Sequence, residues 1–434
     1  ASPLAPHSAW GRRPGVSKRH DSPLGKVPES WTLVHLKDVA EKVKSGATPR
    51  GGDSRYLPSR DRFALIRSQN VFDRRFDETG LAFISDKQAG ELAGAEVQPG
   101  DALLNITGDG VTFARSTLVP ERVLPACVNQ HVMLIRPRRD KCHSGFLLSY
   151  LTHPLIKDYI ESFNAGGSRR AITKGHIESF VIPLPSLGEQ RAIASVLGAL
   201  DDKIELNRRM NETLEAMARA IFQNWFVDAT QTGLPKGWCE STLGDLVELR
   251  VDRVEATPEK DSLRYIALED MPPKSIDVSS YQPGSAVNSS IIAFQKGDVL
   301  FGSMRPYFHK VGLAFFDGIT RTTTFVLRPK HERLRHFSLF HFFSNEVVEF
   351  ATTASVGTTI PYVRWDALER YEIALPPESR LEAFEKAVAP LVQRIAANGA
   401  ESRTLAALRD ALLPRLLSGE LRVPAAAKLV EAKI

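Results

Sequence analysis

The chain has 434 residues, of which 43% are hydrophobic, so it is long and apolar enough for two to four domains with ordinary cores. Its 56 basic and 51 acidic side chains give a net charge of +5, which is too small to identify a nucleic-acid-binding protein by itself. Three cysteines exclude a disulfide framework, and no apolar run approaches the roughly 18 residues of a membrane-spanning helix. We therefore expect a cytoplasmic protein without a membrane partner.

Two halves of the chain repeat the same landmarks in the same order, which predicts two similar domains. The first half contains PESWTLVHLKDVAEKV, VQPGDALLNITGD, HVMLIRPRR and FVIPLP, and the second contains PKGWCESTLGDLVEL, FQKGDVLFGSM, TFVLRPK and YEIALPP. Short runs of Val, Ile and Phe between Gly, Pro and Asp predict strands and turns, so we interpret each half as a mixed α/β domain of an α+β fold. The predicted divisions are a disordered lead-in at 1–24, domains at 25–185 and 232–376, long helices at 186–231 and 377–423, and a tail at 424–434.

Each domain is followed by a predicted long helix whose apolar residues recur at alternating spacings of four and three, the pattern of a coiled-coil seam. The first seam runs from Ile193 to Trp225, and the second runs from Phe384 to Leu416 in the same register. Such a seam needs a partner, and each helix is the obvious partner of the other. We expect an antiparallel pair with internal pseudo-two-fold symmetry, in which Arg409, opposite Leu200, has no explanation.

Polar residues within the two seams suggest their register. Antiparallel pairing places Asn207 opposite Ser402 and Asn211 opposite Asn398, so two polar layers fix the alignment near the middle of the helices. Parallel pairing would also bring Asn207 to Asn398, so the spacing alone leaves both arrangements open. The antiparallel choice rests on the assumed two-fold symmetry.

The string IPLPSLGEQRAIASVLGALDDKIELNRRMNETLEAMARAIFQNWFVD, its weaker copy from Ile373 and the terminal LLPRLLSGELRV resemble the specificity subunit of a type I restriction-modification enzyme. The resemblance covers about residues 25–423. It implies a non-catalytic subunit with two target-recognition domains, each reading one half of a split, asymmetric DNA site, and with the two helices setting the spacing. The second helix departs from the pattern, because Arg380 and Leu381 stand where the first has a Glu-Gln pair.

The resemblance also implies the partners and cofactors of the assembly. Double-stranded DNA and two modification subunits, which methylate adenine N6, are the expected partners, with two ATP-driven restriction subunits in the full assembly. No cofactor is expected on this chain, because S-adenosylmethionine, ATP and Mg²⁺ would be bound by the partner subunits.

Loop residues with suitable chemistry are the candidates for DNA contact. Arg, Asn and Gln read base edges in the major groove, whereas Lys, Arg, Ser, Thr and backbone amides hold phosphates. For each candidate the alternative is a solvated charge or a hydroxyl that stabilises a turn. The candidates are Arg67, Gln69, Asn70, Thr107, Arg115, Arg169, Arg170 and Lys174 in the first domain, and Ser303, Arg305, Tyr307, Lys310, Arg321, Thr358, Thr359 and Arg364 in the second.

Catalysis and metal binding have little support in the sequence. The motifs of common phosphate-binding loops, hydrolases, metalloproteases and adenine methyltransferases are absent from it. Cys127, His131, Cys142 and His143 lack the spacing of a zinc site, and Asp201–Lys203 resembles a nuclease motif but is expected on a solvated helix face. No metal site is expected. Two alternatives stay open: a coiled-coil scaffold that binds no DNA, and an enzyme with an unrecognised site.

Overall fold

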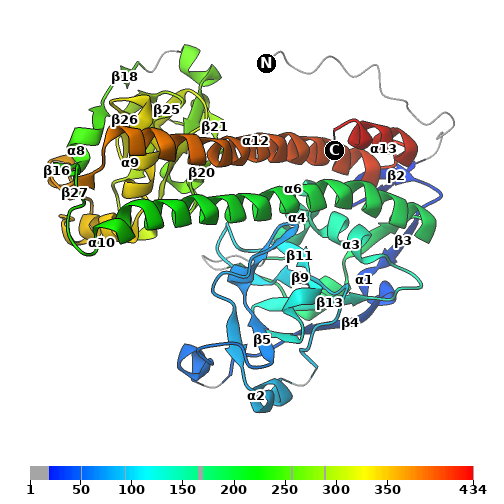
Figure 1. Ribbon diagram of the computed structural model, residues 1–434. Coiled ribbons are helices and arrows are strands. Elements are labelled where there is room, and N and C mark those ends of the chain that lie inside the picture. Colours follow the sequence, from blue (N-terminus) through cyan, green and yellow to red (C-terminus); the bar gives the residue numbers. More distant parts are fainter. Residues whose placement is uncertain are drawn as a thin grey trace. The chain divides into compact units, whose positions relative to one another are not determined.

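Figure 1 shows the computed structural model, which describes residues 19–433 except residues 50, 93, 165–169, 256–257 and 288–289. The chain divides into two compact units: unit 1 consists of Ala1–Glu205 and Leu405–Ile434, and unit 2 consists of Leu206–Thr404. Both long helices contribute residues to both units, so this division differs from the predicted separation of domains and helices. Among the described residues, no helix has both the length and the apolar character of a membrane-spanning segment.

Unit 1 is built around a four-stranded sheet of order β11-β9-β13-β4 and a three-stranded sheet of order β12-β5-β8, in which β12 and β5 are parallel. Its strands are β1 (Arg19–Ser22), β2 (Gly25–Pro28), β3 (Thr32–His35), β4 (Ala40–Ser45), β5 (Phe63–Ile66), β6 (Val71–Phe72), β7 (Arg75–Phe76), β8 (Ala82–Ile84), β9 (Ala102–Asn105), β10 (Thr107–Gly108), β11 (Ser116–Leu118), β12 (Ala126–Val128), β13 (Val132–Pro137), β14 (Arg170–Ala171) and β15 (Val181–Leu184). Its shorter helices are α1 (Leu36–Val39), η1 (Gly52–Arg55), η2 (Ser68–Asn70), α2 (Asp86–Glu91), η3 (Glu121–Val123), α3 (Ser144–Leu151), α4 (Pro154–Ser162), α5 (Lys174–Glu178) and α13 (Val423–Glu431).

Unit 2 has two five-stranded sheets of orders β17-β26-β23-β24-β20 and β18-β22-β25-β19-β21, together with the antiparallel pair β16-β27. Its strands are β16 (Cys239–Thr242), β17 (Val247–Arg250), β18 (Arg253–Val254), β19 (Arg264–Ile266), β20 (Asp277–Val278), β21 (Gln282–Pro283), β22 (Ile291–Phe294), β23 (Val299–Gly302), β24 (Val311–Ala314), β25 (Gly318–Arg321), β26 (Thr324–Pro329) and β27 (Glu372–Leu375). Its shorter helices are η4 (Gln223–Val227), α7 (Asp228–Thr230), α8 (Leu243–Leu246), η5 (Pro258–Ser262), η6 (Leu268–Asp270), η7 (Gly284–Ala286), η8 (Pro306–Phe308), η9 (Glu332–Leu334), α9 (Arg335–Phe342), α10 (Asn345–Thr353) and α11 (Trp365–Leu368).

The central sheet of each unit separates two apolar cores, because successive side chains of a strand point to opposite faces. In unit 1, Leu104 joins the core that contains the helices, whereas its neighbour Leu103 joins the core of the three-stranded sheet. In unit 2, Val299 and Phe301 face the helices, and Leu300 faces the second sheet. Burial on both faces explains why these strands are continuous apolar runs rather than alternating ones.

A buried ion pair holds the same turn in both units. The Arg136 guanidinium donates to both carboxylate oxygens of Asp101 at 2.8 Å, and that carboxylate accepts from the backbone NH of Gln98. In unit 2 Arg328 binds both oxygens of Asp298 at 2.8 and 2.9 Å in the same way. The PGD and KGD strings noticed in the sequence are therefore one structural device used twice, and the prediction of two similar mixed α/β domains is confirmed.

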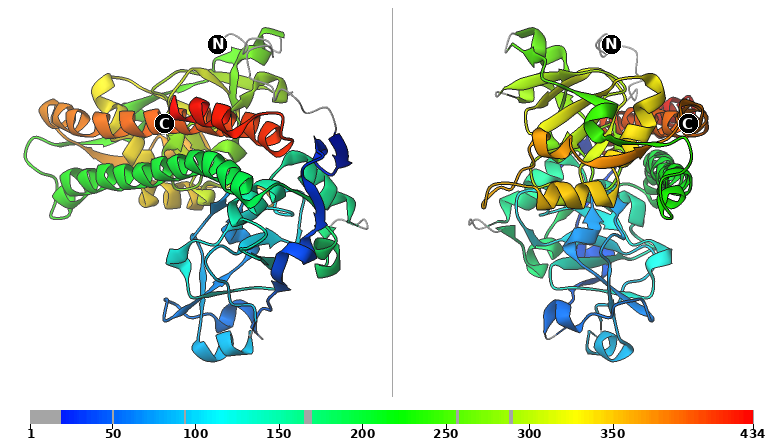
Figure 2. Two further views of the ribbon diagram at one scale, coloured as in Figure 1. Left: turned by 90° about the vertical axis from the view of Figure 1, so that its right-hand side faces the viewer. Right: turned by 60° about the vertical axis from the view of Figure 1, so that its left-hand side comes forward.

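The long helices are α6 (Leu187–Phe222) and α12 (Glu378–Leu417), and in each unit a stretch of α6 lies beside a stretch of α12 (Figure 2). In unit 2 the Asn398 side chain donates to the Asn211 amide oxygen at 2.8 Å. Asn207 donates to the Ser402 hydroxyl at 3.3 Å and also to Glu401 at 2.8 Å, a contact that the seam pattern did not show.

Aromatic packing in unit 2 fixes the direction of the pair. The rings of Trp225 and Phe384 lie 6.2 Å apart between centroids. This contact excludes the parallel arrangement, in which Trp225 would lie opposite Leu416. The predicted antiparallel register is confirmed.

Arg409, which did not fit the seam, has a specific partner in unit 1. It donates to Asp201 at 2.9 Å, and Arg74 donates to the other oxygen of the same carboxylate at 2.7 Å. Asp201 is only 16% exposed, so placing it on a solvated helix face was wrong. Arg74 also binds the hydroxyls of Ser149 and Thr152, so its guanidinium joins α3 to Asp201 of α6, which in turn binds Arg409 of α12.

An equivalent turn attaches unit 2 to its stretch of the helices. Arg74 and Lys274 both adopt left-handed backbone conformations, with φ of 59° and 53°. The residues after Lys274 bind α6, because Glu215 accepts from the Ile276 backbone NH at 2.9 Å and Asn211 donates to Asp277 at 3.0 Å. Burial raises the pKa of both Glu215 and Asp277.

The expected lead-in and tail are partly ordered. Residues 1–18 lie outside the described part, but β1 pairs with β2, so the prediction of disorder through residue 24 was wrong for residues 19–22. Residues 423–431 form α13 rather than a tail, because Ala426 and Val430 pack into the apolar core of unit 1.

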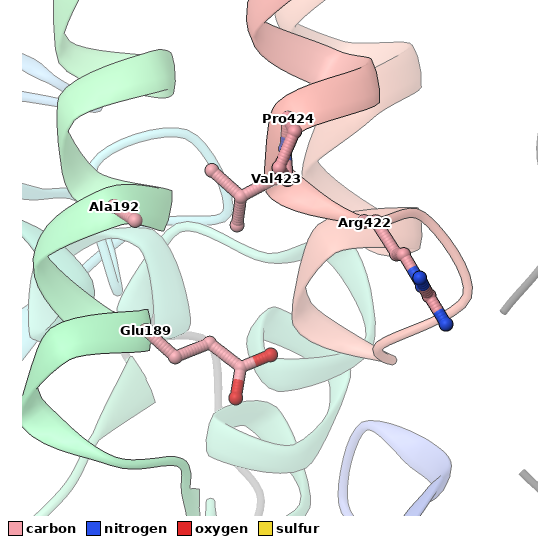
Figure 3. A pocket seen from close by; sticks show the side chains of 5 residues that line it. All are labelled: Glu189, Ala192, Arg422, Val423 and Pro424. Carbon is pink, nitrogen blue, oxygen red and sulfur yellow. The ribbon is translucent and has the colours of Figure 1, made fainter.

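The start of α6 carries a Glu-Gln pair that α12 lacks, and the contacts of these residues explain the difference. Gln190 is fully buried and binds the backbone of residues 141, 143 and 185. Glu189 lines a surface cavity of about 420 Å³ with Ala192 and the start of α13, and the Arg422 side chain points away from α6 (Figure 3). In α12, Arg380 instead donates to the Trp225 carbonyl at 3.1 Å.

Candidate nucleic-acid interface

The loop between β23 and β24 in unit 2 has a strained backbone. Arg305 and His309 adopt left-handed conformations, with φ of 48° and 52°, and between them lies the single 3₁₀ turn η8, which starts with Pro306. Non-glycine residues in this conformation cost free energy and persist where the surroundings enforce them. Such strain commonly marks functional loops.

A second loop, at residues 355–363, holds the first in place. The Arg305 backbone NH donates to the Pro361 carbonyl at 2.7 Å, and the Val363 NH donates to the Ser303 carbonyl at 3.0 Å. At the far end of the first loop, the buried His309 ring contacts the Phe343 carbonyl at 2.9 Å. Burial lowers the pKa of His309, so the ring stays neutral there. We call residues 303–310 and 355–363 the unit 2 loop pair.

Large apolar side chains project from the unit 2 loop pair into solvent. It carries five of the fourteen exposed large hydrophobic side chains in the described chain: Tyr307 (50%), Phe308 (47%), Val356 (44%), Ile360 (45%) and Tyr362 (45%). Apolar groups gathered on a surface mark a binding site more often than single ones do. Of these five, Tyr307 alone was predicted from the sequence, although the strings RPYF and IPY both place proline next to a tyrosine.

The polar groups of the unit 2 loop pair suit a negatively charged ligand. Neither loop contains an acidic residue. The Arg305 guanidinium makes no hydrogen bond or ion pair with any residue that the structure describes, and Thr358 and Thr359 are exposed in the second loop. Of the predicted residues, the structure therefore groups Arg305, Tyr307, Thr358 and Thr359.

The remaining candidates of unit 2 are placed differently. Ser303 is buried and donates to the Thr323 carbonyl at 2.8 Å, so its prediction as a DNA contact was wrong. Lys310 donates to the Leu268 carbonyl at 2.7 Å, and burial lowers its pKa. Arg364 is exposed and pairs with Asp366 at 2.9 Å, and Arg321 is exposed at the end of β25.

Unit 1 repeats the same backbone frame with other side chains. The loop at residues 106–115 connects β9 to β11, and Ala114 has the left-handed conformation of His309, with φ of 60°. The Ile172 NH donates to the Ile106 carbonyl at 3.0 Å, as Val363 does to Ser303 in unit 2.

The side chains at the tip of the unit 1 loop differ from those of unit 2. Asp109 caps the turn and accepts from the backbone NH groups of Val111 and Thr112, and these hydrogen bonds lower its pKa. Val111 is 68% exposed and is the large apolar residue at the tip. This loop therefore offers an acid and a valine where the unit 2 loop offers arginine and two aromatic rings.

The candidates near the unit 1 loop have partners inside the chain. The Thr107 hydroxyl contacts the His131 ring at 2.6 Å, and the Arg170 guanidinium pairs with Glu161 at 2.8 Å. Arg169 lies outside the described residues. The other two candidates are Lys174, which pairs with Glu178 at 3.3 Å, and Arg115, which stacks on the Phe72 ring at 4.4 Å together with Arg75 at 4.3 Å.

A capping turn after β5 explains the candidates at residues 67–70. Asn70 is fully buried, and its side chain binds the Arg67 NH at 3.0 Å and the Asp77 carbonyl at 2.9 Å, so its prediction as a base contact was wrong. Gln69 is exposed on this turn, with one contact of 3.2 Å to the Gly80 carbonyl.

Unit 2 repeats this turn after β19. Asp270 accepts from the Ala267 NH at 2.9 Å, as Asn70 does from Arg67. Glu269 occupies the exposed position of Gln69. This position could not be predicted from the sequence, because the two turns share only the capping side chain, which is Asn70 in one and Asp270 in the other.

No metal site emerges among the described residues, where no three His, Cys, Asp or Glu side chains are grouped to hold an ion. Cys127 and Cys142 are buried, and burial raises the pKa of their thiols to about 11 and about 12. The two thiols are therefore protonated at neutral pH, which suits neither a metal ligand nor a nucleophile.

Comparison with known proteins identifies the relatives of this chain. The family model described as the type I restriction modification DNA specificity domain matches it twice, at residues 28–216 and 235–386. The type I restriction enzyme MjaIX specificity subunit of Methanocaldococcus jannaschii is 26% identical and aligns over 93% of this chain and 96% of its own length. The HindI specificity subunit of Haemophilus influenzae is 21% identical over 90% of this chain and 99% of its own.

A solved structure shares the fold. The crystal structure of the type I restriction-modification S subunit from M. genitalium superimposes with a TM-score of 0.54 at 15% sequence identity, covering 91% of this chain and 98% of that one. At this identity the likeness supports the fold alone.

Proposed function

Because this chain belongs to the family of type I restriction-modification DNA specificity subunits, whose members recognise DNA sequence and carry no catalysis of their own, we propose that it reads a bipartite site. Each unit reads one half-sequence, and the chain recruits modification and restriction subunits. The two half-sequences differ, so the site is asymmetric.

The repeated loop frame carries this proposal. Both units tie a loop with a left-handed residue to a second segment by the same backbone hydrogen bond, from Ile172 to Ile106 and from Val363 to Ser303. The side chains that the two frames present are unrelated. Since base edges are read by side chains while the frame sets their position, the same frame with different residues is what reading two different half-sequences requires.

The spacing between the half-sequences is assigned to the helix pair. Helices α6 and α12 have 36 and 40 residues, which corresponds to about 54 and 60 Å of helix at a rise of 1.5 Å per residue. Both helices contribute to both units, and the paired amides of Asn211 and Asn398 oppose slippage of one helix along the other. A pair that resists slipping supports a fixed gap between the half-sequences.

Two surface cavities support two modification subunits per chain. In unit 1 a cavity of about 260 Å³ lies between α3, β11 and α6, and in unit 2 one of about 450 Å³ lies between α9, β24 and α12. Equivalent helix positions, 191 residues apart (398 − 207), line both cavities. The equivalent pairs are Ala194 and Glu385, Gly198 and Ala389, Asp201 and Val392, Asp202 and Gln393, and Glu205 and Ala396.

The chemistry belongs to the other subunits of the proposed assembly. Methyl transfer from S-adenosylmethionine to adenine takes place on the modification subunits, and ATP and Mg²⁺ are used by the restriction subunits. This chain holds the DNA and brings the methyltransferases to it, which requires no nucleophile or general base of its own.

Selection from random duplexes tests the proposal. The assembled chain and modification subunits are mixed with duplexes of random sequence, and the bound DNA is recovered and sequenced. We expect a motif with two defined halves and an undefined gap of constant length, and binding that weakens as salt is raised because phosphate contacts release counterions. A scaffold without DNA affinity predicts no enriched motif and no salt dependence, and that result refutes the proposal.

A further inference from the structure

We propose that the unit 2 loop pair inserts its paired aromatic rings between base pairs of the half-site that unit 2 reads. This inference rests on the proposed function and adds a mode of recognition to it: local unstacking of the duplex by Tyr307 and Phe308. The ligand is double-stranded DNA at a flexible base step.

The two rings form a single stiff apolar tip. Their centroids lie 4.8 Å apart with the planes inclined by 54°, so each ring supports the other. Pro306 at the start of η8 is buried, and its ring fixes one backbone angle of the turn. About half of the surface of Tyr307 and of Phe308 is exposed, so the tip is held by its backbone and not by burial of the rings.

The strained frame keeps the tip in position before any ligand binds. Left-handed residues on both sides of η8 are enforced by the hydrogen bond from Arg305 to Pro361 and by the buried contact of His309 with Phe343. A loop fixed in advance loses little conformational entropy on binding. Proteins that kink DNA insert such rigid apolar wedges between base steps, at a cost of unstacking that extra contacts offset.

The surroundings of the tip favour DNA over another protein surface as the occupant. Both loops lack acidic residues, the Arg305 guanidinium is unpaired within the described chain, and Thr358 and Thr359 are exposed in the second loop of the pair. A cation and two hydroxyls beside exposed rings match phosphates on either side of an opened base step. An apolar protein partner would leave the unpaired guanidinium buried without a counter-charge.

The equivalent loop of unit 1 supplies the contrast. It carries Asp109 and Val111 at its tip, and its aromatic residue, Phe113, is buried in the core of unit 1, so it exposes no ring that can stack between bases. We therefore expect distortion in one half-site only. Pyrimidine–purine steps unstack most easily, so the half-site read by unit 2 is expected to contain one at the wedge.

Fluorescence of 2-aminopurine tests this inference. The assembled complex binds its selected duplex with 2-aminopurine placed in turn at positions of both half-sites, leaving out the adenine that is methylated. We expect a rise in fluorescence at one step of the unit 2 half-site. In Phe308→Ala that rise disappears and the duplex binds about 5- to 150-fold more weakly, the range for loss of one base–aromatic stack.

Two matched variants complete the test. Val111→Ala shortens an exposed apolar side chain at the equivalent loop of unit 1, and it is expected to leave the fluorescence rise in the unit 2 half-site unchanged. Phe308→Trp restores a stacking ring and is expected to restore the fluorescence. The thermal unfolding midpoints of all variants are measured as a control for folding. They are expected to match that of the wild type, because about half of the Phe308 surface is exposed.

Three outcomes overturn the wedge. The first is a wild-type complex that selects its split site but unstacks no step, which leaves the proposed function standing. The second is a complex with Phe308→Ala in which the 2-aminopurine fluorescence rises as much as it does with the wild type. In the third, the complex with Phe308→Ala loses its modification subunits during gel filtration, and the remaining chain binds DNA as before. That result assigns the apolar patch to a protein interface. A wild-type complex that selects no split site instead contradicts the proposed function.

Discussion

The carboxylate of Asp201 is expected to be the most sensitive single group in unit 1. It accepts from two guanidinium groups, Arg74 and Arg409, whose side chains are 6% and 19% exposed. Asp201→Ala leaves the buried Arg74 guanidinium with only the hydroxyls of Ser149 and Thr152 as partners, while Arg409 keeps its contact with Asp410 at 2.9 Å. Removing one partner of a buried ion pair costs about 3–5 kcal/mol, because the remaining charge stays desolvated and unpaired.

The magnitude can be converted into a thermal shift. Unit 1 has the size of a large single domain, for which 1 kcal/mol corresponds to about 2–4 °C. Asp201→Ala is therefore expected to lower the unfolding midpoint of this unit by about 6–20 °C in differential scanning calorimetry of the full chain. Asp202→Ala, at the exposed neighbouring position of the same helix, serves as the control and is expected to have little effect.

Replacing Arg409 instead separates the ion pair from the seam. Arg409→Leu restores an apolar residue beside the fully buried Leu200, and Asp201 keeps its contact with Arg74. We expect a cost below about 1 kcal/mol, since apolar replacement of a buried charge is often neutral or stabilising. Equal midpoints for Asp201→Ala and Asp202→Ala would contradict this account of the network.

Two further predictions concern unit 1. Gln69→Ala is expected to change base preference at one position of one half-sequence with unchanged stability. Asn70→Ala is instead expected to lower the free energy of unfolding by about 1–3 kcal/mol, because it removes a buried side chain that closes the capping turn. Sequencing of selected duplexes measures the first effect, and urea unfolding of the full chain measures the second. His153 accepts the Leu155 NH at 3.1 Å as the cap of α4, and burial lowers its pKa to about 4 from 6.5. The unfolded chain thus binds this proton more readily than the folded one, so stability on the order of 3 kcal/mol is lost as pH falls from about 6.5 to 4. His153→Asn supplies a capping oxygen in place of the ring nitrogen and is expected to lose less stability than the wild type in that window, where the buried His309 and His341, whose pKa values are also lowered by burial, still act in both proteins. Parallel curves for the two proteins would contradict the assignment.

The helix register could be predicted from the sequence because its determinants are regular. Apolar residues at alternating spacings define one face, and the amides of Asn211 and Asn398 have few acceptable neighbours in that face. The direction of the pair required an assumption of symmetry, which the contact of Trp225 with Phe384 in unit 2 confirmed.

Contacts between residues distant in the sequence could not be predicted in the same way. Arg409 did not fit the seam pattern because its partner is a carboxylate on the other helix, Asp201. That carboxylate also binds Arg74, which has a left-handed backbone conformation that no sequence pattern predicts. Such turns usually contain glycine, and here arginine, alanine, lysine and histidine occupy them. The backbone conformation that positions the loops of the candidate interface therefore could not be predicted from the sequence.

Candidate DNA contacts chosen by residue type stay predictions where the side chains are exposed, and they were wrong where a buried polar side chain closes a turn. Asn70 and Ser303 have the chemistry of base and phosphate contacts, but both are buried and bonded to backbone groups. Phe308 and Tyr362 were missed because aromatic residues are more often core residues than exposed ones. Burial decides whether such a residue can contact DNA or closes a turn, and the sequence does not show the burial of single loop residues.

Shortening both long helices by one heptad tests the central claim most directly. Deleting residues 203–209 and 400–406 together removes matched segments, keeps the layer of Asn211 with Asn398, and preserves the contact of Asp201 with Arg409. Seven residues correspond to about 10 Å of helix, or about three base pairs. Selection and sequencing should return both half-sequences unchanged with the gap shortened by about three base pairs. An unchanged gap, or altered half-sequences, would contradict the account.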